Sequence, residues 1–189
     1  MEILIVKNMQ LLKFFFTIFI MGSINSCSYF DEKQCSINTI GEPLAEDTVY
    51  LQVNITIQKN DIFRVYYIPE GKDSFNDQGY IEQKIIGSNE PQYFVFKFPK
   101  GTYLKKIRLD ISESRQNQYF SIHLVKFLFE NKCFEITENF SYFFKGNKFI
   151  FGESNELYNY RTKDLDNKYD PHFLSKNLIN VMDYLLYKD

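Results

Sequence analysis

Residues 49–58 read VYLQVNITIQ, and this stretch decides the fold of the chain. Apolar side chains occupy every second position, and hydroxyl or amide side chains fill the positions between them. Because successive side chains of a strand point to opposite faces, the alternation predicts a strand with one buried face. The pattern recurs after turns rich in Gly, Pro, Asn and Asp, at 62–68, 80–86, 93–98, 106–111, 120–124 and 127–136. Strands at this spacing, with no helical stretch between them, predict a mainly β protein, an antiparallel and jelly-roll-like β-sandwich.

The C-terminal part of the chain follows a different pattern. Asp170 and Pro171 read as the N-cap and the first residue of a helix. Apolar side chains then recur at helical spacing and form one stripe, made of Leu174, Leu178, Val181, Met182, Leu185 and Leu186. We therefore predict that the β-sandwich spans residues 48–137 and that residues 138–189 form a C-terminal extension with an amphipathic α-helix.

The composition limits the classes of function that fit. The chain has 189 residues and a net charge of −2, with 22 Lys plus Arg against 24 Asp plus Glu. Without an excess of basic residues to neutralise phosphates, nucleic-acid binding is not expected. Hydrophobic residues make up 44% of the chain, which is enough for a packed core. Only 2 His and 3 Cys are present, so few ligands exist for a metal site and we expect no cofactor.

Residues 1–26 have the layout of a bacterial secretory signal peptide. Lys7 and Lys13 form a basic region, an apolar run follows at 14–21, and small residues precede Cys27. The apolar run is too short for a stable membrane-spanning helix, which needs about 20 residues. Two interpretations remain, a lipoprotein signal and an ordinary signal peptide that happens to precede a cysteine.

Residues 24–27, Ile-Asn-Ser-Cys, resemble the lipobox of bacterial lipoproteins. The resemblance implies cleavage before Cys27, attachment of palmitate or similar acyl chains to that residue, and a tether over residues 27–47. The acidic pair Asp31 and Glu32 is similar to the surface-export signal of Bacteroidota lipoproteins. We therefore expect a membrane partner in the form of a lipid anchor, in the outer membrane of the cell envelope, with the domain exposed at the surface.

Cys35 and Cys133 would lie in an oxidising compartment after export, where disulfides form and persist. A disulfide between them would close a loop of about 100 residues and contribute around 4 kcal/mol in the chain-entropy model. In the alternative interpretation, Cys133 is a small buried apolar residue. Both interpretations fit the sequence.

Four tyrosines occupy the polar positions of predicted strands, namely Tyr50, Tyr66, Tyr93 and Tyr119. If neighbouring strands bring them together, their rings form an exposed platform that can stack against sugar rings. The alternative is structural, since tyrosine is favoured in strands and its ring can pack beneath the C-terminal segment. This platform is the candidate glycan-binding site.

No catalytic site stands out in the sequence. His123 points away from the apolar face, and with no nucleophile beside it we expect a structural role rather than that of a general base. His172, in the first turn of the predicted helix, is expected to be neutral. Asp164, Asp166 and Asp170 place carboxylates at the close spacing that calcium accepts, although a solvated turn is the favoured alternative.

Several segments together resemble a β-sandwich module that recurs in bacterial envelope proteins: FRVYY at 63–67, IEQKIIG at 81–87, FVFKFP at 94–99, KKIRLD at 105–110 and KYDPHF at 168–173. That module accompanies membrane glycosyltransferases and glycan-assembly proteins. The resemblance covers about residues 49–186 and transfers no catalytic residue. It implies a non-catalytic envelope role linked to glycan. A protein-interaction, accessory or immunity-type lipoprotein is the alternative, and an enzyme is less favoured.

Overall fold

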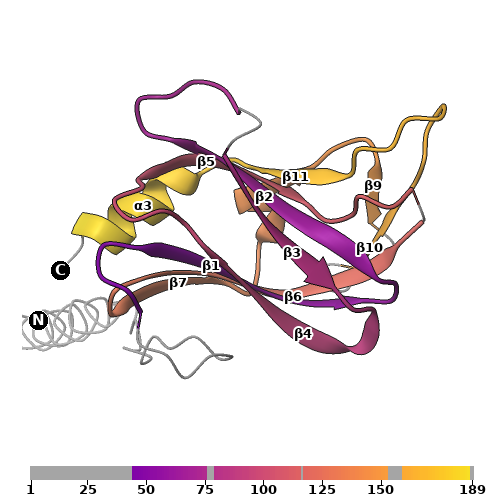
Figure 1. Ribbon diagram of the computed structural model, residues 1–189, viewed down its shortest axis with the longest axis horizontal. Helices are drawn as coiled ribbons and strands as arrows, with labels where there is room; N and C mark the ends of the chain where they lie inside the picture. The colour runs from indigo at the N-terminus through magenta and orange to yellow at the C-terminus, as the bar shows by residue number, and fades with distance from the viewer. Residues whose placement is uncertain (1–43, 76–78, 116, 153–158, 188–189) are drawn as a thin grey trace, which may run out of the picture. The chain divides into compact units, whose positions relative to one another are not determined.

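The computed structural model describes residues 44–75, 79–115, 117–152 and 159–187, and Figure 1 shows how their elements are arranged. All of these residues belong to one compact unit. The predicted signal peptide at 1–26, the lipidation site Cys27, Cys35 and the tether up to residue 43 lie outside the described residues. What the sequence predicts for them stays a prediction.

One sheet has six strands, five of them in the order β4-β1-β6-β10-β9. β7 pairs with the second half of β6, and β10 pairs with its first residues. All pairs in this sheet are antiparallel. The strands are β1 (Val49–Ile57), β4 (Ser88–Lys97), β6 (Tyr119–Phe129), β7 (Lys132–Ile136), β9 (Ile150–Gly152) and β10 (Asn159–Thr162). The stretch at 49–58 therefore supplies a strand that is paired along both edges.

The second sheet has five antiparallel strands in the order β3-β2-β5-β11-β8. They are β2 (Asp61–Pro69), β3 (Tyr80–Ile85), β5 (Leu104–Asp110), β8 (Phe144–Gly146) and β11 (His172–Ser175). Matching places in the two sheet orders hold strands that are neighbours in the chain: β4 and β3, β1 and β2, β6 and β5, β10 and β11, β9 and β8. The chain thus passes repeatedly from one sheet to the other, as in a jelly roll, which confirms the predicted antiparallel sandwich.

The core lies between the two sheets and uses the predicted apolar positions. Leu51, Val53 and Ile55 of β1 are completely buried, as are Phe63 and Val65 of β2. Burying one large apolar side chain contributes about 1.5–3 kcal/mol, so the shared core supplies most of the driving force for folding.

Residues after 137 complete the sandwich and do not form a separate extension. β8 and β11 belong to the five-stranded sheet, while β9 and β10 belong to the six-stranded sheet. The predicted end of the sandwich at residue 137 is therefore corrected. These strands have only 3 or 4 residues each, which is too short for an alternating pattern to be recognised.

The C-terminal helix is present, but it begins later than predicted. α3 spans Leu178–Tyr187, whereas His172–Ser175 form β11. Phe173 lies opposite Leu109 of β5 and is 2% exposed. Pairing with two neighbouring strands and burial of this ring outweigh the local helix signal at 170–171. α2 (Phe140–Phe143) is a single short turn, and neither of these two described helices has the length and apolar character needed to cross a membrane.

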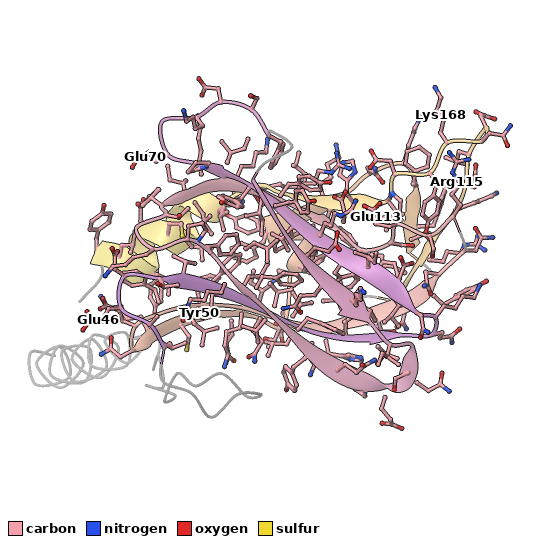
Figure 2. The ribbon with its side chains drawn as sticks, in the orientation of Figure 1. Glu46, Tyr50, Glu70, Glu113, Arg115 and Lys168 are labelled. Carbon is pink, nitrogen blue, oxygen red and sulfur yellow. The ribbon has the colours of Figure 1, made fainter. Side chains whose placement is uncertain are left out.

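The strands run between two ends of the domain. At the proximal end β1 begins beside the last residue of β6, since Val49 lies opposite Phe129. At the distal end β1 finishes beside the start of β6, since Ile57 lies opposite Phe120. Figure 1 shows α3 at the proximal end, and Figure 2 labels Glu46 there.

Candidate functional site

The four tyrosines of the predicted platform do not share a face. Tyr50, Tyr93 and Tyr119 belong to the six-stranded sheet, whereas Tyr66 belongs to β2 of the other sheet. Within the six-stranded sheet, Tyr50 is only 7% exposed, and Tyr93 lies opposite Asn54 further along β1. The predicted alignment is therefore wrong. The reason is topological, because the chain changes sheets between β1 and β2, so that these two successive strands are not neighbours.

Tyr119 instead belongs to a cleft of about 360 Å³ at the distal end of the six-stranded sheet. The Tyr119 side chain is 43% exposed. Ser121 is the next outward-facing residue of β6, and Asn159 of β10 lies opposite it. The lining residues come from β1, β6, β10 and the turn after β1, and they are Thr56, Gln58, Tyr119, Phe120, Ser121, Asn159 and Tyr160.

The cleft combines an aromatic ring with neutral hydrogen-bonding groups. None of the described residues that line it carries a charged side chain. Ser121 donates a hydrogen bond to Oδ1 of Asn159, and Thr56 Oγ1 lies 2.9 Å from His123 Nε2. These contacts orient the polar groups. Asn159 and Gln58 still carry more donors and acceptors than the contacts use, so the cleft can form hydrogen bonds with a ligand.

Two features of the sheet shape the cleft. The rings of Phe120 and Tyr160 stack at 5.4 Å with an interplanar angle of 26° and pack against the core, so they support the strands of the cleft from the inner face of the sheet. A β-bulge after Asn54 shifts the register between β1 and β6, so that Thr56 lies opposite Ser121 beyond it. A bulge bends its strand and increases the local twist, which opens the surface here.

A buried carboxylate organises the loops of the distal end. Asp61, the first residue of β2, is 9% exposed and accepts hydrogen bonds from the side chains of Ser112, Ser114 and Gln118. Burial alone would raise the pKa of Asp61, but the hydrogen bonds from Ser112 and Ser114 outweigh it and hold the pKa below its usual value. The backbone of Gln118 also bonds the backbone and the hydroxyl of Thr162, each at 2.9 Å. The network thus fixes where β6 starts, and with it the position of Tyr119, the first residue of that strand.

Each of the two histidines contacts a hydrogen-bonding side chain of the sandwich. His123 is exposed on β6 and contacts the hydroxyl of Thr56. His172 is in a strand rather than in the predicted helix, and its Nδ1 lies 2.9 Å from Nδ2 of Asn147. Burial lowers the pKa of His172, and Arg108 adds to that effect. The ring is therefore neutral near pH 7, and its Nδ1 also lies 3.1 Å from the carbonyl oxygen of Asp170.

The outward face of the five-stranded sheet carries a tyrosine–arginine lattice that the sequence analysis missed. Tyr66 lies opposite Tyr80, and their ring centroids are 5.3 Å apart. The guanidinium of Arg64 lies 5.5 Å from the centre of the Tyr80 ring, and that of Arg108 lies 5.4 Å from the Tyr66 ring. Arg64 also forms an ion pair with Glu82 at 2.7 Å. The alternation in β2 and β3 signals two outward tyrosines, but only the pairing of β2 with β5 brings Arg108 to them.

Asp170, one of the predicted calcium ligands, is bound by Arg108 of the lattice. Arg108 forms ion pairs with Asp110, at 2.7 Å, and with Asp170. The Asp110 side chain is 6% exposed, and burial raises its pKa to about 6 against the opposing effect of Arg108. Within the described residues no group of three potential metal ligands converges, so the structure does not bring Asp164, Asp166 and Asp170 together as a calcium site.

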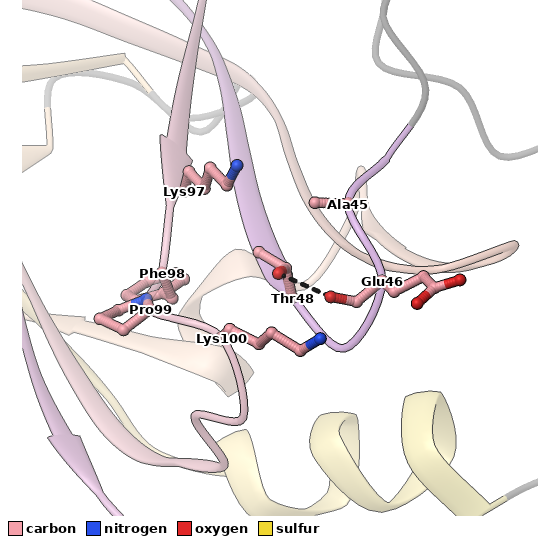
Figure 3. A pocket seen from close by; sticks show the side chains of 7 residues that line it. All are labelled: Ala45, Glu46, Thr48, Lys97, Phe98, Pro99 and Lys100. Atoms are coloured by element: carbon pink, nitrogen blue, oxygen red, sulfur yellow. Dashed lines mark hydrogen bonds between the residues drawn. The ribbon is translucent and has the colours of Figure 1, made fainter.

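A groove of about 620 Å³ lies at the proximal end, and Figure 3 shows it from close by. Lys97 and Lys100 extend along opposite sides of Thr48, while the carboxylate of Glu46 points away from both amines (Figure 3). Among the described residues, no carboxylate lies within ion-pair distance of either lysine. The lining consists of Ala45, Glu46, Thr48, Lys97, Phe98, Pro99 and Lys100.

Cys133 lies in β7 at the proximal end, opposite Leu128 of β6. It is disulfide-bonded, and its partner lies outside the described residues. The interpretation of Cys133 as an unpaired, small buried apolar residue is therefore wrong, whereas its pairing with Cys35 stays a prediction.

Comparison of the chain with protein-family models, with curated proteins and with solved structures finds no match.

Proposed function

We propose that this protein is a membrane-anchored lipoprotein of the bacterial outer membrane whose β-sandwich binds carbohydrate without catalysis. The cleft beside Tyr119 carries the proposal. A sugar ring has a face of C–H groups and a rim of hydroxyls. The first is complementary to the π-face of an aromatic ring, and the second to amide and hydroxyl side chains. The described lining of the cleft offers both kinds of group and no charge.

The position of the cleft supports display away from the membrane. The chain enters the sandwich at the proximal end from the segment that carries the predicted lipid anchor, Cys27. β1 has 9 residues and rises about 3.3 Å per residue, so the cleft lies on the order of 25–30 Å from that point. A glycan outside the membrane would therefore reach the cleft without obstruction by the lipid surface.

The described lining of the cleft lacks the carboxyl groups that glycoside hydrolysis needs. Hydrolysis requires two carboxyl groups that flank the scissile bond, one as an acid and the other as a nucleophile or base. No Asp or Glu is among the described residues that line the cleft. Binding by stacking and neutral hydrogen bonds is what this lining supports.

Glycan-array binding by the wild type and two tyrosine variants tests the proposal. Tyr119→Ala should reduce binding at least tenfold, because it removes the stacking surface of the cleft. Tyr80→Ala is the matched control, since Tyr80 is also 43% exposed but belongs to the other sheet. Loss of binding in Tyr80→Ala, with binding retained in Tyr119→Ala, would move the glycan site to the lattice and contradict the assignment to the cleft.

The anchor is tested separately from the ligand. Cells that express the wild type should incorporate labelled palmitate into the protein and retain it in the outer-membrane fraction. Cys27→Ala should abolish both. Absence of palmitate from the wild type would reject the lipoprotein assignment whatever the glycan array shows.

The tyrosine–arginine lattice favours a second candidate function, binding of another envelope protein. Tyrosine and arginine dominate the residues that carry binding energy at protein interfaces. Here both are held in place, because Arg64 and Arg108 are ion-paired and lie beside tyrosine rings. If the wild type binds no glycan, and in-cell photo-crosslinking from position 80 but not from position 119 captures one protein, this candidate replaces the first.

A further inference from the structure

We propose that the proximal groove binds the head group of a zwitterionic phospholipid, with Lys97 and Lys100 on the phosphate and Glu46 on the ammonium group. The inference rests on the proposed membrane anchoring. It concerns a site at the opposite end of the sandwich from the cleft beside Tyr119.

Hydrogen bonds between two turns hold the groove open. Gly101 N donates to Asp47 O at 2.8 Å, and Phe98 N donates to Val49 O at 3.0 Å. Gly101 has a φ of 71°, a conformation that glycine adopts without strain, so the turn after β4 lies close against the chain before β1. The walls of the groove are thus fixed before any ligand arrives, which lowers the entropy cost of binding.

The charges around the groove are of both signs and are not paired with each other. Lys97 and Lys100 are exposed, and Nζ of Lys97 lies 5.9 Å from the centre of the Tyr50 ring. Glu46 is also exposed, forms no ion pair among the described residues and points away from both amines (Figure 3). The lattice on the five-stranded sheet differs, because its arginines already hold carboxylates.

This arrangement complements a phosphate joined to an amine. A lysine ammonium binds phosphate as a compact point charge, and two lysines can approach the phosphate from different sides. A carboxylate set apart from both lysines can receive the ammonium group without competing for them. Apolar side chains of Ala45 and Pro99 lie in the same groove and can contact the glycerol portion of the lipid.

The location of the groove brings it to the lipid surface if the anchor is present. Ala45 and Glu46 belong both to the groove and to the chain that arrives from the predicted tether. The predicted disulfide between Cys35 and Cys133 would shorten the connection further. It leaves the segment from Cys27 to Cys35, which spans at most about 30 Å when extended.

The test uses the full mature chain in detergent, titrated with soluble glycerophosphoethanolamine and followed by NMR shifts of the groove residues. The double variant Lys97→Gln/Lys100→Gln should weaken binding at least tenfold. Glu46→Gln should weaken binding of glycerophosphoethanolamine several-fold more than binding of glycerophosphoglycerol, which has the phosphate but no amine. Lys145→Gln, an exposed lysine of β8, is the matched control and should bind as the wild type does.

Three results would overturn the inference. One is a wild type that does not respond to glycerophosphoethanolamine, and another is a double-lysine variant that still binds it fully. The third is equal affinity for glycerophosphoethanolamine, glycerophosphoglycerol and inorganic phosphate, which would make the groove a general phosphate site. Failure here, with palmitate labelling intact, would leave the anchor in place and remove only the head-group site, and glycan binding at the cleft is measured independently.

Discussion

The cleft beside Tyr119 and the groove beside Lys97 lie at opposite ends of one sandwich and are built from different chemistry. The described residues of the cleft are neutral and include an exposed ring, whereas the groove carries two lysines and a glutamate. β1 runs from one site to the other, since Thr48 just before the strand lines the groove and Thr56 near its end lines the cleft. Each end of a strand meets different turns, so one sheet presents two unrelated binding surfaces.

The two ends also differ in how their loops are held. At the distal end, the carboxylate of Asp61 is nearly buried and gathers donors from Ser112, Ser114 and Gln118. At the proximal end, backbone hydrogen bonds such as that from Gly101 to Asp47 hold the turns, and the charged side chains remain exposed. The loops beside the distal cleft therefore depend on side-chain hydrogen bonds to Asp61, which a substitution can remove. The turns of the proximal groove depend on backbone hydrogen bonds, which a side-chain substitution leaves in place.

Asp61→Ala should cause the largest loss of stability. It should impair binding at the distal cleft and leave binding at the proximal groove unchanged in the folded protein. Several buried donors would lose their acceptor, and we expect a loss of about 3–5 kcal/mol in the free energy of unfolding. Glycan binding should fall with it, while head-group binding at the proximal groove persists in the fraction that stays folded. Asp73→Ala is the control, because the Asp73 side chain is 94% exposed.

With the variant Asp61→Asn, the pH dependence of stability gives a second test of the Asp61 carboxylate. Its pKa is lowered in the folded state, so its contribution to stability is present above the unfolded pKa of about 3.8 and is lost as the pH falls through the folded value. The difference in unfolding free energy between the wild type and Asp61→Asn should shrink from pH 7 to pH 3. A difference that stays constant over that range would mean that the ionised carboxylate is not what holds the loops.

Cys133→Ser should destabilise the proximal end by about 2–4 kcal/mol, because the unfolded chain gains freedom when a long loop is no longer closed. Urea unfolding of the wild type under non-reducing conditions, compared with the variant, measures the effect. In the same preparation, maleimide labelling of the denatured wild type should find neither Cys35 nor Cys133 free. A labelled Cys35 would show that the bond to Cys133 is made by another cysteine.

Asp110→Asn should have a smaller effect, with a pH dependence of the opposite sign. The folded pKa is raised to about 6, so the contribution of Asp110 is fully present below about pH 4 and is lost as the pH rises through 6. The stability of the wild type relative to the variant should therefore fall between pH 4 and 6, by at most about 3 kcal/mol. His172→Gln serves as the comparison, because the lowered pKa of His172 predicts a gain in stability as the pH rises toward 6.5.

The smallest expected effects separate the two exposed tyrosines. Tyr119→Ala should change the unfolding free energy by no more than about 0.5 kcal/mol, as is usual for a surface site. Tyr80→Ala should cost about 1 kcal/mol, because its ring lies beside Tyr66 and the guanidinium of Arg64. Equal losses, measured by thermal or urea unfolding, would mean that the Tyr119 ring is as firmly packed as that of Tyr80 and is not free to receive a sugar.

Alternation of side chains was enough to predict the long strands. β1, β2 and β5 follow the segments that the pattern marks, and their inward side chains, such as Leu51, Phe63 and Leu109, are completely buried. The pattern works there because each strand is long enough for a period of two to emerge from the composition. It fails for β8 to β11, whose 3 or 4 residues carry no measurable period.

The sequence by itself determined the class of fold, the apolar core positions of the long strands and the place of the four platform tyrosines on the polar faces of their strands, because these follow from local alternation along one strand. Only the tertiary structure decided which outward residues meet. The change of sheet between β1 and β2 separates Tyr66 from Tyr119, and pairing with β5 brings Arg108 to Tyr66 instead. Residues 172–175, predicted as part of a helix, form a strand because β5 and β8 on either side supply hydrogen-bond partners for their backbone groups. Register and sheet order depend on contacts between residues far apart in the chain, and no local pattern records them.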